Sequence, residues 1–141
     1  MSALTCYQGI AAAFRGVEGL RGLMLGEPTG DMDLPCLYIA YASFERPLRN
    51  SPPARNLTGM RHIFAARLVI QWVDNSQAEM QLITLLDQIP AALDLDPHLS
   101  GLMHSGAAYC DTGVTGFASI GGVLYRIVDY QITVLEKIAA S

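Results

Sequence analysis

The histidines and cysteines are the side chains in this sequence with the clearest capacity for metal binding or acid–base chemistry. His98, His104 and Cys110 follow one another at steps of six residues, and Asp111 comes directly after Cys110. Zinc ligands on helices and in finger motifs are usually separated by about two to five residues, so this spacing fits neither pattern. We therefore expect no metal site and no cofactor. A small hydrolase or ligand-binding domain with a pocket near His98, His104 and Cys110 stays open as an alternative.

Motifs for nucleophilic catalysis or phosphate binding are absent from the sequence, which contains no GxSxG, GxGxxG or GxxxxGK[ST] pattern. We interpret Ser119 as an ordinary residue at a strand end, and Asp94 with Asp96 as a solvated helix exit. His62 begins an apolar strand, where a hydrogen-bonded structural histidine is the common explanation. We expect no catalytic residues, and so no enzyme.

Arginine makes up eight of the nine basic residues, and half of the arginines lie in one turn-rich stretch: Arg46, Arg49, Arg55 and Arg61. Guanidinium groups on such a stretch can bind phosphates or the acidic surface of a neighbouring subunit. A loop kept solvated by its charge is the plain alternative. Residues 74–96 contain five acidic and no basic side chains. This separation of charge favours the docking of copies side by side.

Length and composition predict one domain over residues 1–141, because 141 residues with 51% hydrophobic content suffice for one sizeable core. The sequence has no run of about 18 apolar residues and no N-terminal secretion signal, so we expect a cytoplasmic protein without a membrane partner. Cys6, Cys36 and Cys110 form no CxxC pair and are interpreted as reduced core thiols. The net charge of -4 gives no general signature of nucleic-acid binding.

Hydrophobic periodicity in the first half predicts a helix from Ser2 to about Arg15 and a strand from Cys36 to Phe44. A projecting arm at about residues 45–60 should follow, because prolines and asparagines there cannot pack a core. The strand from His62 to Val73 alternates clearly, and we expect its face with His62, Phe64 and Trp72 to be buried.

In the second half, Ser76 and Glu79 have the spacing of a capping box and should open a helix. Its apolar stripe runs through Leu82, Leu85, Leu86, Ile89 and Leu93, and Pro90 should kink or end it. Residues 107–120 and 123–136 are expected to form a hairpin joined at Gly121-Gly122. The predicted fold class is α+β, an antiparallel sheet with a long β-hairpin arm and helices packed on one face.

Three stretches mark this order of elements along most of the chain. They are Leu34-Pro35-Cys36-Leu37-Tyr38-Ile39 before the arm, Leu85-Leu86-Asp87-Gln88-Ile89-Pro90 at the end of the helix, and Gly121-Gly122-Val123-Leu124-Tyr125-Arg126 in the closing hairpin. The arrangement resembles the tail terminator and tail-completion proteins of long-tailed bacteriophages. The match is one of architecture, without a signature motif.

The resemblance implies a structural protein of the virion, assembled in the host cytoplasm. Copies of the chain would form a homo-oligomer, a hexameric ring that caps the tail tube protein and docks to the head-tail connector protein, with DNA passing non-specifically through the lumen. A head-tail adaptor or another neck component is the alternative. Residue chemistry, rather than a family motif, assigns Arg46, Arg49, Arg55 and Arg61 to subunit, partner or lumen contacts.

The arginine-rich arm leads to a first prediction. The double variant Arg49→Glu/Arg55→Glu should weaken assembly while the melting temperature stays the same, because charges on a loop contribute little to the core. Light scattering during size exclusion measures the mass of the assembly. An unchanged mass in the variant would remove the arm from the assembly argument.

Overall fold

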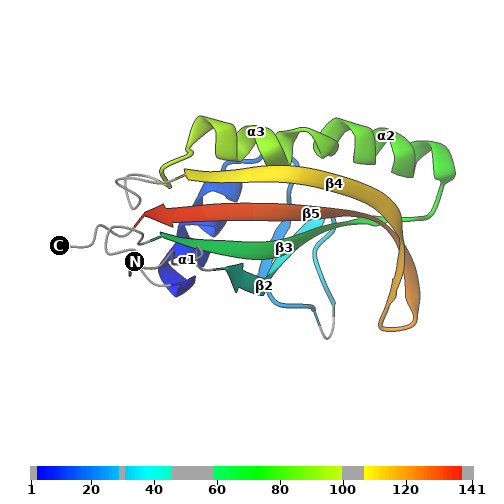
Figure 1. Ribbon diagram of the computed structural model, residues 1–141. Helices are drawn as coiled ribbons and strands as arrows, with labels where there is room; N and C mark the ends of the chain where they lie inside the picture. Colours follow the sequence, from blue (N-terminus) through cyan, green and yellow to red (C-terminus); the bar gives the residue numbers. More distant parts are fainter. Residues whose placement is uncertain (1–2, 29–30, 46–58, 100–106, 138–141) are drawn as a thin grey trace.

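The computed structural model describes residues 3–28, 31–45, 59–99 and 107–137, and these residues form an α+β fold (Figure 1). Their five strands make one sheet in the order β1-β2-β3-β5-β4. Three helices accompany the sheet. The elements are α1 (Ala3–Phe14), β1 (Gly22–Leu25), β2 (Cys36–Glu45), β3 (Gly59–Gln71), α2 (Asn75–Leu86), α3 (Gln88–Leu95), β4 (Ala107–Ile120) and β5 (Val123–Lys137).

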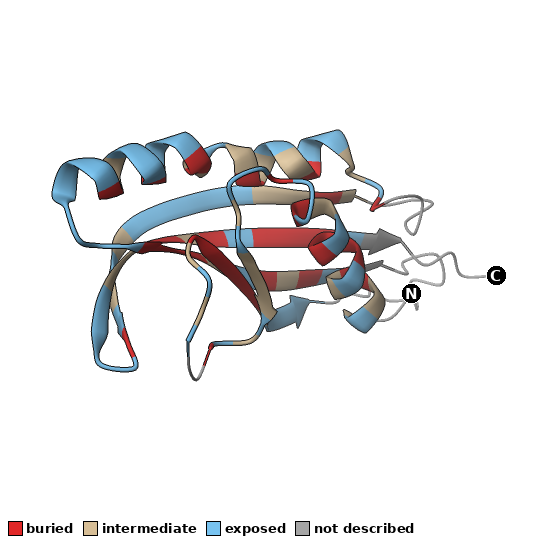
Figure 2. Ribbon diagram, turned by 180° about the vertical axis from the view of Figure 1, so that it is seen from behind, coloured by how far each residue is buried: buried red, intermediate tan, exposed pale blue. Residues whose placement is uncertain are grey.

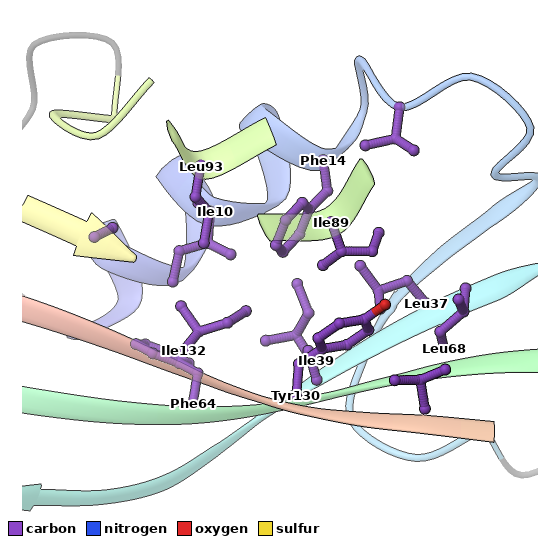
Figure 3. Packing of buried hydrophobic residues seen from close by; sticks show 14 of the residues in the cluster. Ile10, Phe14, Leu37, Ile39, Phe64, Leu68, Ile89, Leu93, Tyr130 and Ile132 are labelled. Carbon is purple, nitrogen blue, oxygen red and sulfur yellow. The ribbon is translucent and has the colours of Figure 1, made fainter. Parts of the chain in front are cut away.

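All three helices pack on one face of the sheet, as the sequence predicts. Alternate residues of β2, β3 and β5 point to this face, and the register places them in cross-strand rows such as Leu37, Leu68 and Val128. Figure 3 shows Ile10 of α1 and Leu93 of α3 above these rows. The sheet residues of the buried core are Leu37, Ile39, Phe64, Ala66, Leu68, Ile70, Ala108, Val128, Tyr130, Ile132 and Val134.

The opposite face of the sheet carries polar pairs and a smaller apolar cluster. Arg67 and Asp129 face each other across β3 and β5 with two hydrogen bonds, Nε to Oδ1 at 2.6 Å and Nη2 to Oδ2 at 3.1 Å. Tyr38, Val69, Ile120 and Ile127 form the cluster. No helix of the described residues packs on this face, and its centre is held by a bidentate ion pair.

The sheet differs from the prediction at one edge, where β1 pairs with β2 in parallel. The sequence analysis predicts no strand here, yet Gly22 begins β1. A Cβ atom on Gly22 would lie 2.8 Å from the carbonyl oxygen of Asp33, so the close approach of the two segments requires glycine. The amides of Arg21 and Gly22 both donate to the Pro35 carbonyl, at 2.9 and 3.2 Å.

The start of α2 corrects the predicted capping box. The N-cap is Asp74, whose Oδ1 accepts hydrogen bonds from the amides of Ser76 at 2.8 Å and Gln77 at 3.4 Å. Asp74 has the extended backbone that an N-cap needs, whereas Ser76 already lies within the helix. Glu79 is consequently free to make a tertiary contact.

Pro90 is predicted to kink or end the helix that begins near Ser76, but the helix does not break at Pro90. The break comes three residues earlier, at Asp87, which closes α2 and begins α3. Pro90 is the third residue of α3, where the missing amide has no helical partner to lose. The apolar stripe itself is confirmed, because Leu82, Leu85, Ile89 and Leu93 are all buried.

Trp72 lies outside the buried face on which the sequence places it. The β3 ladder ends with the pairing of Gln71 and Tyr125, after which the chain turns towards the cap of α2. Trp72 is 38% exposed. Its indole N–H donates to Asn75 Oδ1, and its ring packs edge-on against Phe117.

The closing hairpin is confirmed, and its strands are long. Gly121 and Gly122 both have positive φ angles, 59° and 82°, which a two-residue turn of this kind requires. In Figure 1 the distal end of the hairpin curves away from the helices. At the other hairpin, β2 and β3 stay paired as far as Glu45 and Arg61. The arm that joins them falls on residues 46–58, which lie outside the described residues.

The core leads to a prediction with a matched control. Leu68→Ala should lower the free energy of unfolding by about 3 kcal/mol, because it opens a cavity between the sheet and the helices. Leu95→Ala removes the same atoms from a side chain that is 88% exposed and should change stability by less than about 0.5 kcal/mol. Urea unfolding measures both values. Equal effects of the two substitutions would contradict this packing.

Candidate assembly interface

The structure does not favour chemistry at the histidine and cysteine stretch. Cys110 is half-buried in β4, and burial, with smaller contributions from Asp111 and Asp94, raises its pKa to about 11. A thiol with this pKa stays protonated at neutral pH, so it is a poor nucleophile. His98 is exposed after α3, and His104 lies outside the described residues. Among the side chains that the structure describes, no three metal-capable groups come together.

The other chemically capable residues have structural positions. Ser119 is an exposed residue near the end of β4, and Asp96 is the C-cap of α3, next to exposed Asp94 in the last turn. His62 is buried, and its Nδ1 lies 2.7 Å from the hydroxyl of Tyr41. These placements agree with the interpretations of a strand end, a helix exit and a structural histidine.

Of the four arginines expected at subunit or partner contacts, Arg61 is the one that the structure describes. Its exposed side chain lies 3.7 Å from Glu45 Oε2, across the base of the β2–β3 hairpin. An exposed pair at this distance contributes little to stability. Arg46, Arg49 and Arg55 fall outside the described residues, so their role stays a prediction.

Some carboxylates of the acidic segment 74–96 already bind groups of the same chain. Asp74 caps α2, and Glu79 accepts a hydrogen bond from Arg126 Nε at 2.5 Å. Asp87 and Asp94 remain exposed. The negative charge available for docking a neighbour is therefore smaller than the sequence suggests.

Arg126 makes three contacts, one that joins the β4–β5 hairpin to Glu79 of α2 and two with its partner strand β4. Besides its bond to Glu79, Nη1 donates to the Gly116 carbonyl at 2.8 Å, and the guanidinium lies over the Phe117 ring, 4.7 Å from its centre. Only 13% of the Arg126 side chain is exposed. Charge, hydrogen bonding and ring stacking thus act together at one point along the hairpin.

Around this point and beyond it, the hairpin exposes apolar side chains. Val114 and Phe117 of β4 and Val123 and Leu124 of β5 are all exposed, with Val114 at 67%. Figure 2 shows the distal hairpin and the outer side of the α2–α3 layer as largely exposed. Phe117 and Leu124 lie on the helix side of the hairpin, whereas Val114 and Val123 lie on the opposite side. Both sides of the hairpin thus expose large apolar side chains, which is typical of surfaces that bind another protein.

The sequence analysis predicts the hairpin but not these exposed side chains. Leu124 does lie on the helix side of β5, but the helices do not reach it. The distal hairpin instead curves away from α2 and α3 (Figure 1), and Leu124 stays 42% exposed.

The anchoring contacts lead to a third prediction. Arg126→Lys should lower the free energy of unfolding by about 1–2 kcal/mol, because an ammonium group cannot reach Glu79, Gly116 and the Phe117 face together. Arg15→Lys, at an exposed position after α1, is the matched control and should have no measurable effect. Thermal unfolding followed by circular dichroism compares them. A fully stable Arg126→Lys protein would show that the hairpin is held by other contacts.

No protein-family model matches the sequence, and a search of curated proteins likewise gives no match. The resemblance to phage tail terminators therefore rests on the order of elements alone. The described residues form a sheet that helices cover on one face. Its β4–β5 hairpin is anchored to α2, curves away from the helices and exposes apolar side chains.

Proposed function

We propose that this protein has a structural role, in which copies of the chain bind one another through the distal β4–β5 hairpin. The observation that carries the proposal is the exposure of Phe117, Val123 and Leu124 on a hairpin held firmly by Arg126. A monomer gains nothing from exposing these side chains, whereas a neighbouring subunit would remove them from water.

The more specific proposal is a ring that caps the phage tail tube and docks to the head connector. The order of elements supports it, because α1, the β2–β3 hairpin, the α2–α3 layer and the β4–β5 hairpin follow one another as the resemblance requires. In this role the protein would reside in the virion neck. A head-tail adaptor would use the same contacts at a different position.

The pocket hypothesis gains no support from the described residues. The raised pKa of Cys110 opposes a nucleophilic role, and the His98 side chain is solvent-exposed. Helices in the described part of the chain are also too short or too polar to cross a membrane.

Assembly through the hairpin tip is tested with two double variants. Val123→Ser/Leu124→Ser should shift the protein from a ring of about six subunits towards monomers, because it removes apolar surface at the tip. Met80→Ser/Ile83→Ser makes the same kind of change at exposed positions on α2 and should leave the ring intact. Light scattering during size exclusion gives the masses, and negative-stain images show the shape.

Two results would contradict the proposal. A wild-type protein that stays monomeric from micromolar to millimolar concentration, and binds neither a tube nor a connector protein, would exclude the assembly role. Equal masses of the wild type and the tip variant would exclude the tip as the contact.

A further inference from the structure

Two backbone edges of the sheet are open in the described residues. β4 is an outer strand, and its side chains from Thr112 to Ser119 are all exposed or half-exposed. At the other edge, β1 covers β2 only from Cys36 to Ile39, which leaves residues 40–45 of β2 without an outer neighbour among the described strands. An open edge presents a row of amides and carbonyls that can pair with a further strand.

A hydrogen bond at the β4 edge shows which amides point outward. The Ala108 amide donates to the Pro97 carbonyl at 2.9 Å, outside the ladder with β5. Amide direction alternates along a strand, and the irregularity between Cys110 and Thr112 shifts the alternation by one residue. The amides that point outward beyond it are those of Gly113, Thr115, Phe117 and Ser119.

A second hydrogen bond fixes the β2 edge in the same way. The Gly26 amide donates to the Ile39 carbonyl at 2.8 Å, so the backbone amide and carbonyl of Ile39 point away from β3, towards the open edge. The register shift between Tyr41 and Ser43 then places the Phe44 amide outward as well. The two edges can be checked against each other through the registers of β3 and β5. Starting from the outward Ile39, these registers predict that the Ala108 amide also points outward, as its hydrogen bond to Pro97 shows.

Apart from the bulge between Tyr41 and Ser43, neither edge has the usual protection against strand addition. Natural edge strands carry lysine, proline or an inward charge that blocks pairing. Residues 112–120 of β4, TGVTGFASI, contain no charged residue and no proline, and the same is true of residues 40–44 of β2, AYASF. Glu45, at the end of the open β2 edge, is the one charged residue there, and its side chain is 70% exposed and pairs with Arg61. Both edges can therefore accept a strand without burying an unpaired charge.

We propose that the β4 edge, residues 112–119, pairs with residues 40–45 of β2 in a second copy of this chain. This inference rests on the proposed self-assembly and names the contact that produces it. β2, β3, β5 and β4 are successively antiparallel, so β2 and β4 run in opposite directions. A rotation about an axis along the strands keeps these directions. It brings β4 of one copy beside β2 of the next as an antiparallel pair, and the sheet continues from subunit to subunit.

The size of this contact favours a closed ring over a dimer. A six-residue edge is about 20 Å long and buries a few hundred Å², well below the roughly 1,000 Å² of a stable pairwise interface. The exposed hairpin side chains add to the area of each contact. Every subunit has two different edges, however, and only a closed ring pairs both edges of every subunit. Monomers and rings should therefore coexist without a stable dimer.

Proline substitutions test the two edges separately. Thr115→Pro removes an outward amide of β4 and should convert rings to monomers, while Thr115→Ala keeps the amide and should leave the ring intact. Phe44→Pro and Phe44→Ala form the matched pair at the β2 edge, with the same expected outcomes. Thr115→Lys, which places a charge on the edge, should also give monomers if a folding defect obscures the proline result.

The masses from light scattering separate the possible failures, with circular dichroism as the check on folding. Rings that persist in Thr115→Pro and Thr115→Lys would overturn the edge pairing while leaving the proposed self-assembly in place. Dissociation of Thr115→Pro with intact rings of Phe44→Pro would exclude β2 as the strand that pairs with β4. A wild-type monomer at all concentrations would overturn both the pairing and the proposed function.

Discussion

The pairing of β3 with β5 over residues 59–71 and 125–137 is the constraint on which the other features depend. Because side chains alternate along a strand, this one register places Phe64, Leu68 and Ile132 under the helices and Arg67 with Asp129 on the opposite face. A shift by one residue would exchange the two faces. The same register also sets the direction of the backbone amides at both outer edges of the sheet, so the packing of the core determines which edge groups can bind a neighbour.

The curvature of the sheet then decides what is exposed. The helices run along the sheet as far as the bend of β4 and β5, and the distal hairpin curves away from them (Figure 1). Arg126 holds this extension against α2, which limits its motion relative to the core. A rigid hairpin loses less entropy on binding than a flexible one, so its apolar tip is well suited to a permanent contact between subunits.

Local patterns made much of the fold predictable. The alternation from His62 to Ile70 and the Gly121-Gly122 turn need no distant partner to be recognised. The four residues of β1 could not be recognised, because their strand exists only through pairing with β2 and through the close approach at Gly22. The contact of Glu79 with Arg126 joins residues 47 positions apart. Trp72 was misplaced because the ladder with β5 ends one residue earlier, and the three arm arginines lie outside the described residues.

Residue-resolved amide exchange in the assembled protein tests the central claim most directly. The account predicts that the outward amides of Gly113, Phe117 and Ser119 exchange slowly in the assembly and fast after dilution to monomers, whereas the inward amides of Val114 and Gly116 are protected in both states. Equal exchange of the outward amides in assembly and monomer would contradict the claim that neighbouring subunits pair through this edge.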